Sequence, residues 1–134
     1  MEKTFVMIKP DGVKRKLIGE IIGRIEKKGL SVVKIVMRDP ELSILEDHYR
    51  DHRSKGFYKD LMEFMSSGKL VALQVEGDDS IRIMRSLIGE TDPTCASPGT
   101  IRGDFANSKT ENLVHASDSE DAAKRELLLW FGED

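Results

Sequence analysis

His115 lies where an apolar, strand-like pair gives way to the start of a helix. Leu113 and Val114 precede it, and Ala116-Ser117-Asp118-Ser119 follow it. An unperturbed imidazole has a pKa of about 6.5, so a neutral ring that can act as a nucleophile or a base is available near pH 7. Taken alone, the same position also fits a histidine that fills the core or caps the helix.

Small polar and basic residues lie in and around a long irregular segment, residues 91–111. The sequence contains neither a P-loop nor a dinucleotide-binding glycine motif, which disfavours both of those kinds of phosphate site. The side chains that could bind phosphate instead come from several parts of the chain: Lys9, Arg85, Thr91, Thr100 and Arg102. Each of them taken singly is most simply a solvated surface group.

Two other patterns point to different chemistry, and neither is complete. His48 and His52 have the i, i+4 spacing of paired metal ligands, but the glutamate of an H-E-x-x-H motif and a third ligand are missing. We therefore predict that the chain itself holds no metal and that this pair lies on an ordinary helix face. The segment 55–59 begins like an RNA-recognition motif and then departs from it, so RNA binding is disfavoured. Phe57 and Tyr49 stay open either as platforms for a single base or as core residues.

Composition limits the class of protein. The chain has 134 residues, of which 39% are hydrophobic and 34% charged, and this is typical of one globular domain, which we expect over residues 1–134. The formal net charge of -3 argues against a broad surface for nucleic acids or membranes, so we expect neither as a required partner. No signal peptide or membrane span is recognisable, and the single cysteine, Cys95, cannot form an internal disulfide. These features together predict a cytoplasmic protein.

Apolar periodicity predicts the elements that must position the candidate side chains. Strands are expected over 4–8, 30–37, 70–76 and 113–114, where β-branched or aromatic runs are bounded by turn residues. Helices are expected from 18 to the glycine at 29, over 43–52, 57–67 and 79–88, and over 118–131. The order predicts an α+β sandwich with a β-α-β-β-α-β skeleton, in which helices cover a four-stranded sheet.

Local signals refine the ends of these elements. Residues 9–12 are expected to form a turn after the first strand. Ser43 and Glu46 have the spacing of a capping box at the start of the second helix. Asp78 and Asp79 are expected to cap the helix that ends at Gly89.

The segment Asn112-Leu113-Val114-His115-Ala116-Ser117-Asp118 resembles the active-site signature N-x-x-H-[GA]-S-D of nucleoside diphosphate kinases. The chain is similar to that family at three further places in the same order. These are residues 4–13 (its opening strand and loop), residues 90–93 with 98–105 (its nucleotide-site loop) and Glu126 before 130–131 (its final helix). Two residues depart from the common pattern, Ala116 at a position where glycine is commoner and Glu111 where arginine is common.

The resemblance implies a ferredoxin-like α+β fold with an antiparallel sheet, and a kinase that acts on nucleotides. The kinase would move the γ-phosphoryl group of a nucleoside triphosphate, chiefly ATP, to a nucleoside diphosphate in ping-pong fashion and with broad base specificity. It would use Mg2+ bound with the nucleotide phosphates and would assemble as a homohexamer or homotetramer. The implied residue roles are His115 as the phosphorylated nucleophile; Glu126 and Ser117 as its supports; Lys9, Arg85, Thr91 and Arg102 as phosphate ligands; Asn112 and Lys9 as sugar contacts; Phe57 as the base platform; and Tyr49 as a residue close to the pocket.

A module on the same fold that binds nucleotides or partner proteins without catalysis is the second hypothesis. Such a chain is expected to lack the histidine or one of the phosphate ligands. Every one of those residues is present here, and this favours the enzyme.

Overall fold

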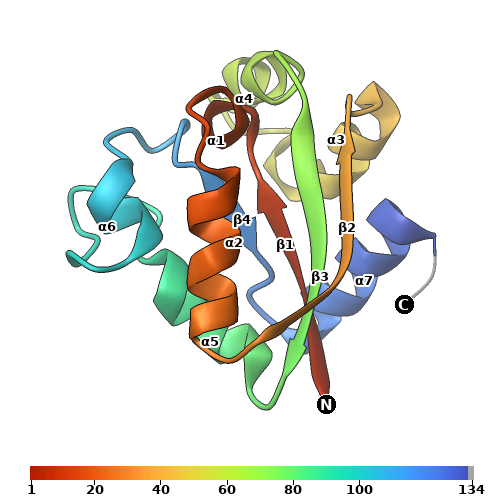
Figure 1. Ribbon diagram of the computed structural model, residues 1–134. Coiled ribbons are helices and arrows are strands. Elements are labelled where there is room, and N and C mark those ends of the chain that lie inside the picture. The colour runs from red at the N-terminus through yellow and green to blue at the C-terminus, as the bar shows by residue number, and fades with distance from the viewer. Residues whose placement is uncertain (133–134) are drawn as a thin grey trace.

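A four-stranded antiparallel sheet organises the chain, in the strand order β2-β3-β1-β4. The computed structural model describes residues 1–132. Its strands are β1 (Glu2–Ile8), β2 (Ser31–Arg38), β3 (Leu70–Gly77) and β4 (Val114–Ala116). The helices between them complete a β-α-β-β-α-β order, so the predicted ferredoxin-like α+β fold is confirmed (Figure 1).

Side chains alternate along the central strand β1, and helices cover both faces of the sheet. Val6 and Ile8 pack on one face with α2 (Ile18–Lys27) and α5 (Ser80–Ile88). Phe5 and Met7 pack on the other with α3 (Leu42–His48), α4 (Tyr58–Met65) and α7 (Glu120–Phe131). Because β1 is buried from Thr4 to its end, the residue that follows it is held in a fixed place at the end of a central strand.

Two segments that were predicted to be a turn and an irregular loop contain short helices in the structure. Residues 9–12, predicted as a turn, belong largely to α1 (Pro10–Lys14), which has Pro10 in its first turn. The long segment 91–111 contains α6 (Ile101–Phe105), and a 3-10 turn, η1 (Arg50–His52), follows α3. Of the helices described over residues 1–132, none is both long and apolar enough to cross a membrane.

The predicted capping box at the start of α3 is wrong. The helix begins at Leu42 after Glu41, so Ser43 already lies inside it, and the cap position makes no side-chain hydrogen bond. The helix ends at His48, where η1 takes over, and not at 52 as predicted. The S-x-x-E spacing is present, but the chain enters the helix two residues earlier.

The start of α5 is capped from the neighbouring strand and not by the predicted aspartates. The Asp79 side chain makes no capping bond and pairs instead with Arg82, 3.3 Å away. Glu2 Oε1 in β1 accepts a hydrogen bond from the Ile81 N–H at 2.8 Å. The carboxylate therefore satisfies one of the free N–H groups at the positive end of the helix.

Replacing the capping carboxylate tests this contact. We expect Glu2→Ala to lower the free energy of unfolding by about 1 kcal/mol, which is the usual contribution of a side-chain cap. For a domain of this size the melting temperature should fall by about 4 °C. Lys3→Ala, an exposed change at the next position, is the matched control in the same calorimetric scans. Equal melting temperatures for the two variants would contradict the proposed cap.

The edge strand β2 carries apolar side chains that the fold leaves exposed. Val33, Ile35, Val36 and Met37 are each between 40% and 55% exposed. Exposed apolar residues gathered on a free sheet edge are characteristic of a surface that another chain covers.

Candidate active site

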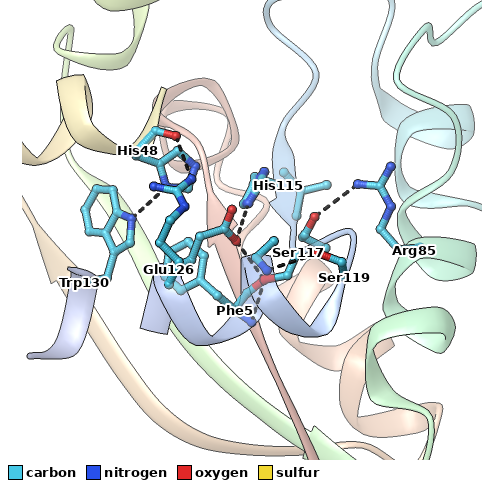
Figure 2. A network of polar contacts seen from close by, with 12 residues as sticks. Phe5, His48, Arg85, His115, Ser117, Ser119, Glu126 and Trp130 are labelled. Carbon is cyan, nitrogen blue, oxygen red and sulfur yellow. Dashed lines mark hydrogen bonds and ion pairs between the residues drawn. The ribbon is translucent and has the colours of Figure 1, made fainter. Parts of the chain in front are cut away.

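His115 lies in β4 and faces a buried carboxylate on α7. The β4 register pairs it with Met7 of the central strand. His115 Nε2 lies 3.0 Å from Glu126 Oε1, and Glu126 is only 5% exposed (Figure 2). Since an ionised carboxylate only accepts hydrogen bonds, the imidazole proton of a neutral His115 belongs on Nε2. The lone pair is then on Nδ1, which is the nitrogen free to react.

Ser117 holds the same carboxylate oxygen from the other side. Its hydroxyl donates to Glu126 Oε1 at 2.7 Å and accepts the Phe5 N–H at 3.2 Å (Figure 2). Ser117 is fully buried, so no water competes for these bonds. The carboxylate that orients His115 is therefore itself fixed by the central strand. The predicted junction of a strand and a helix is confirmed here, because Ser119 caps α7 through the Ala122 N–H at 3.1 Å.

Lys9 follows β1 directly and is buried beside Asn112. Its Nζ donates to Asn112 Oδ1 at 2.8 Å, while Asn112 Nδ2 donates to the carbonyl oxygens of Lys109 at 3.0 Å and Thr91 at 3.3 Å. Burial, and then the charge of Arg102, lower the pKa of Lys9 to about 8. Asn112 thus ties the lysine to the long segment 91–111, where Thr91 itself is exposed.

A left-handed residue turns the chain just before His115. Leu113 has φ +76°, which costs about 1–3 kcal/mol in a residue other than glycine. Its carbonyl accepts the Lys9 N–H at 2.8 Å, and its own N–H donates to Asp11 Oδ2 at 3.1 Å. Burial raises the pKa of Asp11. These bonds hold the turn that brings Asn112 back to the end of β1.

The two predicted arginines also reach the segment that carries His115. Arg102 is buried and donates to the carbonyl oxygens of Gly89 at 3.0 Å, Val114 at 2.7 Å and Asn112 at 3.4 Å. Arg85 Nη1 donates to the Ala116 carbonyl at 3.1 Å (Figure 2). Burial, and then the charge of Arg85, lower the pKa of Arg102 to about 10. Burial and a neighbouring cation therefore disfavour the charged states of Lys9 and Arg102, which is the condition that a bound anion relieves.

Close packing of the long segment places Arg102. A Cβ atom at Gly103 would overlap the Ser97 carbonyl, so this helix position must be glycine. The Gly103 N–H donates to Thr100 Oγ1 at 3.0 Å and thereby caps α6. The sequence predicted this segment as irregular, although Thr100 is a residue type that favours the start of a helix.

His48 belongs to the same cluster, and the sequence analysis missed it. It is 6% exposed, its Nδ1 accepts the Trp130 N–H at 3.0 Å, and its ring centroid lies 4.7 Å from that of His115 (Figure 2). The prediction of an ordinary helix face is wrong for this residue. Glu126 and Trp130 are four residues apart and share a helix face, but no local pattern in the sequence places His48 opposite that face.

A cavity of about 450 Å³ opens beside His115. It is lined on one side by the α3–η1 corner, including Tyr49, and on the other by the first turns of α7. The Tyr49 hydroxyl is buried and has no hydrogen-bond partner among residues 1–132. Burial, and then the charge of Glu126, raise the pKa of Tyr49. The hydroxyl stays neutral and can donate to a bound molecule.

Phe57 lies apart from the His115 cluster. Its ring is 49% exposed, 5.5 Å from the ring of His52 and 5.7 Å from Lys55 Nζ. It is not among the residues that line the cavity at His115. Because Phe57 is exposed, it is not a core residue, and only its interpretation as a base platform stays open. Tyr49, by contrast, is part of the core.

One group in the described residues 1–132 could hold a metal ion. Ligand atoms of His48, His115 and Glu126 all lie within 4.8 Å of one another. Two imidazoles and one carboxylate suit zinc-like ions, whereas Mg2+ prefers oxygen ligands and keeps several waters. This donor set therefore does not fit a resident Mg2+.

Comparisons with known proteins agree along almost the whole chain. A model of the protein family described as nucleoside diphosphate kinase matches residues 2–134. A nucleoside diphosphate kinase of Exiguobacterium sp. is 53% identical over 99% of this chain and 96% of its own length. A nucleoside diphosphate kinase of Metallosphaera sedula is 55% identical over 97% of this chain and 93% of its own length. The structure of the enzyme from Encephalitozoon cuniculi superposes with a TM-score of 0.98, at 46% identity over 100% of this chain and 91% of that one. The structure of the enzyme from Halobacterium salinarum, in complex with CDP, superposes with a TM-score of 0.96, at 46% identity over 99% of this chain and 89% of that one.

Proposed function

The chain belongs to the nucleoside diphosphate kinase family and is a phosphotransferase, and we propose that His115 carries the phosphoryl group between its two nucleotide substrates. In the first half of the proposed cycle, the Nδ1 lone pair forms a bond to the γ-phosphorus of a nucleoside triphosphate, chiefly ATP. The bond from that phosphorus to the bridging oxygen breaks, and the diphosphate leaves. In the second half, a terminal oxygen of another nucleoside diphosphate attacks the phosphorus and the N–P bond breaks, so donor and acceptor use one pocket in turn.

The contact between His115 and Glu126 is the observation that carries this proposal. Because the Glu126 carboxylate accepts the hydrogen bond of the His115 Nε2–H, Nδ1 is left as the nucleophilic nitrogen. His115 is half-buried and lies beside a cavity. Phosphorylation at Nδ1 places positive charge on the ring, and the buried carboxylate offsets that charge. Ser117 keeps the carboxylate in place during both halves of the cycle.

The three cations supply the charge that a triphosphate needs. We assign Lys9, Arg85 and Arg102 to the phosphates, because each forms a hydrogen bond to the segment 112–116. Burial and a neighbouring charge also disfavour the charged states of Lys9 and Arg102, and a bound phosphate would offset this cost. Each charge pair at 4 Å contributes about 4 kcal/mol at an effective dielectric near 20, before desolvation is subtracted. Phosphoryl transfer depends mainly on such positioning and charge neutralisation.

The remaining assigned residues contact the rest of the nucleotide. Thr91 would join the phosphate ligands, and Asn112 with Lys9 would contact the sugar; Asn112 already bonds to both Lys9 and the Thr91 carbonyl. The exposed ring of Phe57 would stack on the base, at about 1–3 kcal/mol and with little reading of the base edges. We therefore propose broad base specificity, and the CDP bound to the Halobacterium relative supports acceptance of a pyrimidine.

We assign Mg2+ to the nucleotide and not to a resident site. It would bind oxygens of the phosphate chain, where it neutralises charge on the group being transferred. The Tyr49 hydroxyl, unpaired among the described residues, is available to donate to that same chain.

Initial-rate kinetics test the proposed cycle. Exchange between ATP and a nucleoside diphosphate should give parallel lines in double-reciprocal plots, with GDP, CDP and UDP all accepted. Intersecting lines would show that both nucleotides must bind before any transfer, and this would contradict a phosphorylated intermediate.

The depressed pKa of Lys9 predicts a loss of activity in mildly alkaline solution. The amine loses its proton as pH rises through about 8, and a neutral amine no longer attracts the phosphates. Since kcat/KM reports the ionisations of the free enzyme, it should fall about tenfold per pH unit above that point. The measurement is kcat/KM for ATP between pH 6 and 9.5. The Lys9→Arg variant, which stays charged, should show no such fall even if its activity is lower, and a flat profile for the wild type would contradict the assignment.

The exposed apolar side chains of β2 support a homo-oligomer, which we propose to be a hexamer or a tetramer. A second copy that covers Ile35 and Met37 would remove their side chains from water. Light scattering after size exclusion should give four or six times the chain mass of 15.1 kDa, whereas a monomer mass would contradict the proposal.

We also propose that the chain is a single domain. The two clusters of apolar side chains lie on opposite faces of one sheet and share its strands β1 and β3. The cytoplasmic location stays a prediction from the sequence.

A further inference from the structure

We propose that His48 is a positioning residue for phosphoryl transfer: Trp130 selects its tautomer, and its ring holds the ring of His115 in the orientation that presents Nδ1. The inference rests on the proposed role of His115. It concerns a residue to which the sequence analysis assigned no part in the reaction and whose ring packs directly against that of the nucleophile.

The tautomer of His48 follows from its hydrogen bond to Trp130. An indole N–H is only a donor, so His48 Nδ1, 3.0 Å from Trp130 Nε1, must be an acceptor. A neutral imidazole carries one proton, which is then on Nε2. An imidazolium would point an N–H at the indole N–H, so taking up a proton costs His48 this buried hydrogen bond. With Nδ1 used by Trp130 and Nε2 protonated, neither nitrogen is free to ligate a metal in this arrangement.

The ring of His48 is packed tightly enough to hold a neighbour. It lies edge-to-face against Tyr49, with centroids 4.6 Å apart, and against Trp130 at 5.8 Å. The Phe5 ring lies 5.9 Å away at a tilt of 57°. The carbonyl of His48 accepts a hydrogen bond from Arg125 at 3.3 Å. Its backbone and its ring are therefore both fixed to α7.

His48 meets His115 at 80°, with ring centroids 4.7 Å apart. A ring in this position opposes rotation of His115 about its Cβ–Cγ bond. Glu126 alone restrains only one nitrogen of His115, so the imidazole could still tilt about that single hydrogen bond. The ring of His48 supplies the second restraint.

One helix face thus orients both imidazoles. Glu126 and Trp130 are one turn apart on α7; the first bonds to His115 and the second to His48 (Figure 2).

The neutral state of His48 matters because several cations and titratable groups face it. These are His115 on β4, Arg125 on α7, Lys9 after β1 and His52 in η1, with Glu126 the acidic neighbour. Burial first, and then these positive charges, hold the pKa of His48 well below its ordinary value. A proton on His48 would place a cation against the ring of His115, which itself gains positive charge on phosphorylation, and would therefore oppose that step.

Two substitutions of His48 test the contribution of its ring and that of its hydrogen bond separately. In His48→Asn the amide oxygen can still accept the Trp130 N–H, but no ring reaches His115. In His48→Phe the ring is retained and the acceptor is lost. We expect the single-turnover rate of His115 phosphorylation by Mg-ATP to fall about 10- to 100-fold in His48→Asn, with ATP affinity unchanged, because misorientation of a reacting group has effects of this size. His48→Phe should retain most of the rate, and thermal melts establish that each variant is folded.

Equal rates for His48→Asn and the wild type would overturn the proposal, and so would an equal fall in the two variants. Nitrogen-15 NMR of labelled histidines gives a readout independent of activity. His48 should show a single tautomer with its proton on Nε2 from pH 6 to 8, and Trp130→Phe should lose that preference. A proton on Nδ1 in the wild type would overturn the tautomer assignment. If the wild type forms no phosphohistidine at all, the proposed function fails while the NMR result stands, so the two failures are distinguishable.

Discussion

The variant His115→Ala should lose phosphate exchange between nucleotides almost completely. Without the imidazole the neighbouring groups are poor substitutes for Nδ1, because His48 Nδ1 accepts a hydrogen bond from Trp130 and Glu126 Oε1 accepts one from Ser117. Removing a covalent nucleophile typically costs about 10⁴-fold or more in kcat. The measurement is the coupled assay of ATP-to-GDP transfer, with labelled ATP used to look for a phosphorylated chain.

The control for this variant is nucleotide binding. Lys9, Arg85 and Arg102 bond to backbone or side-chain atoms other than the His115 ring. ADP should therefore bind His115→Ala with nearly the wild-type affinity, which would assign the loss to chemistry and not to misfolding. A variant that still exchanges phosphate at a substantial rate would show that another group is the nucleophile.

Lys9→Met should have the second largest effect. The lysine is buried at the end of β1, and burial disfavours its cation until a phosphate arrives. Removing one preorganised donor from a charge-stabilising site typically lowers kcat by about 10²–10³-fold. Methionine has nearly the same length, so it should fill the buried space of the lysine stem without overpacking. The steady-state rate with saturating ATP and GDP is the quantity to compare.

Lys14→Met is the matched control, because Lys14 is an exposed lysine at the other end of the same short helix, α1, and its Nζ donates to Ser67 Oγ at 3.2 Å. Its activity should stay near that of the wild type. Similar losses in the two variants would mean that general surface charge, and not the buried Lys9 cation, supports the reaction.

Much of the fold was predictable because the apolar residues that become buried recur along the chain with the short periods of strands and helices. Residues 4–8 and 70–75 form continuous β-rich runs, and these become the two central strands, buried on both faces. The spacing of Ile18, Ile21 and Ile25 likewise defines α2. The predicted cap of α5 was wrong because the real cap depends on a contact between distant residues: Glu2 caps this helix from 79 residues before Ile81.

The site was only partly predictable for the same reason. His115 and its cations were identified from the resemblance of short motifs, which hold their spacing along the chain. His48 was missed because its role depends on Trp130, 82 residues further along, and no local pattern pairs them. The left-handed turn at Leu113 was also missed, since Lys9 and Asp11 hold it from the far side of the fold.

The most direct test of the account is to isolate the phosphorylated chain and discharge it. After incubation with labelled ATP and removal of all nucleotide, the protein should carry an acid-labile, base-stable phosphate that mass spectrometry locates on His115. Adding GDP alone should then transfer the label to GTP in a single turnover. If the isolated chain carries no label, or if its label lies elsewhere or is not discharged by GDP, His115 is not the carrier of the phosphoryl group.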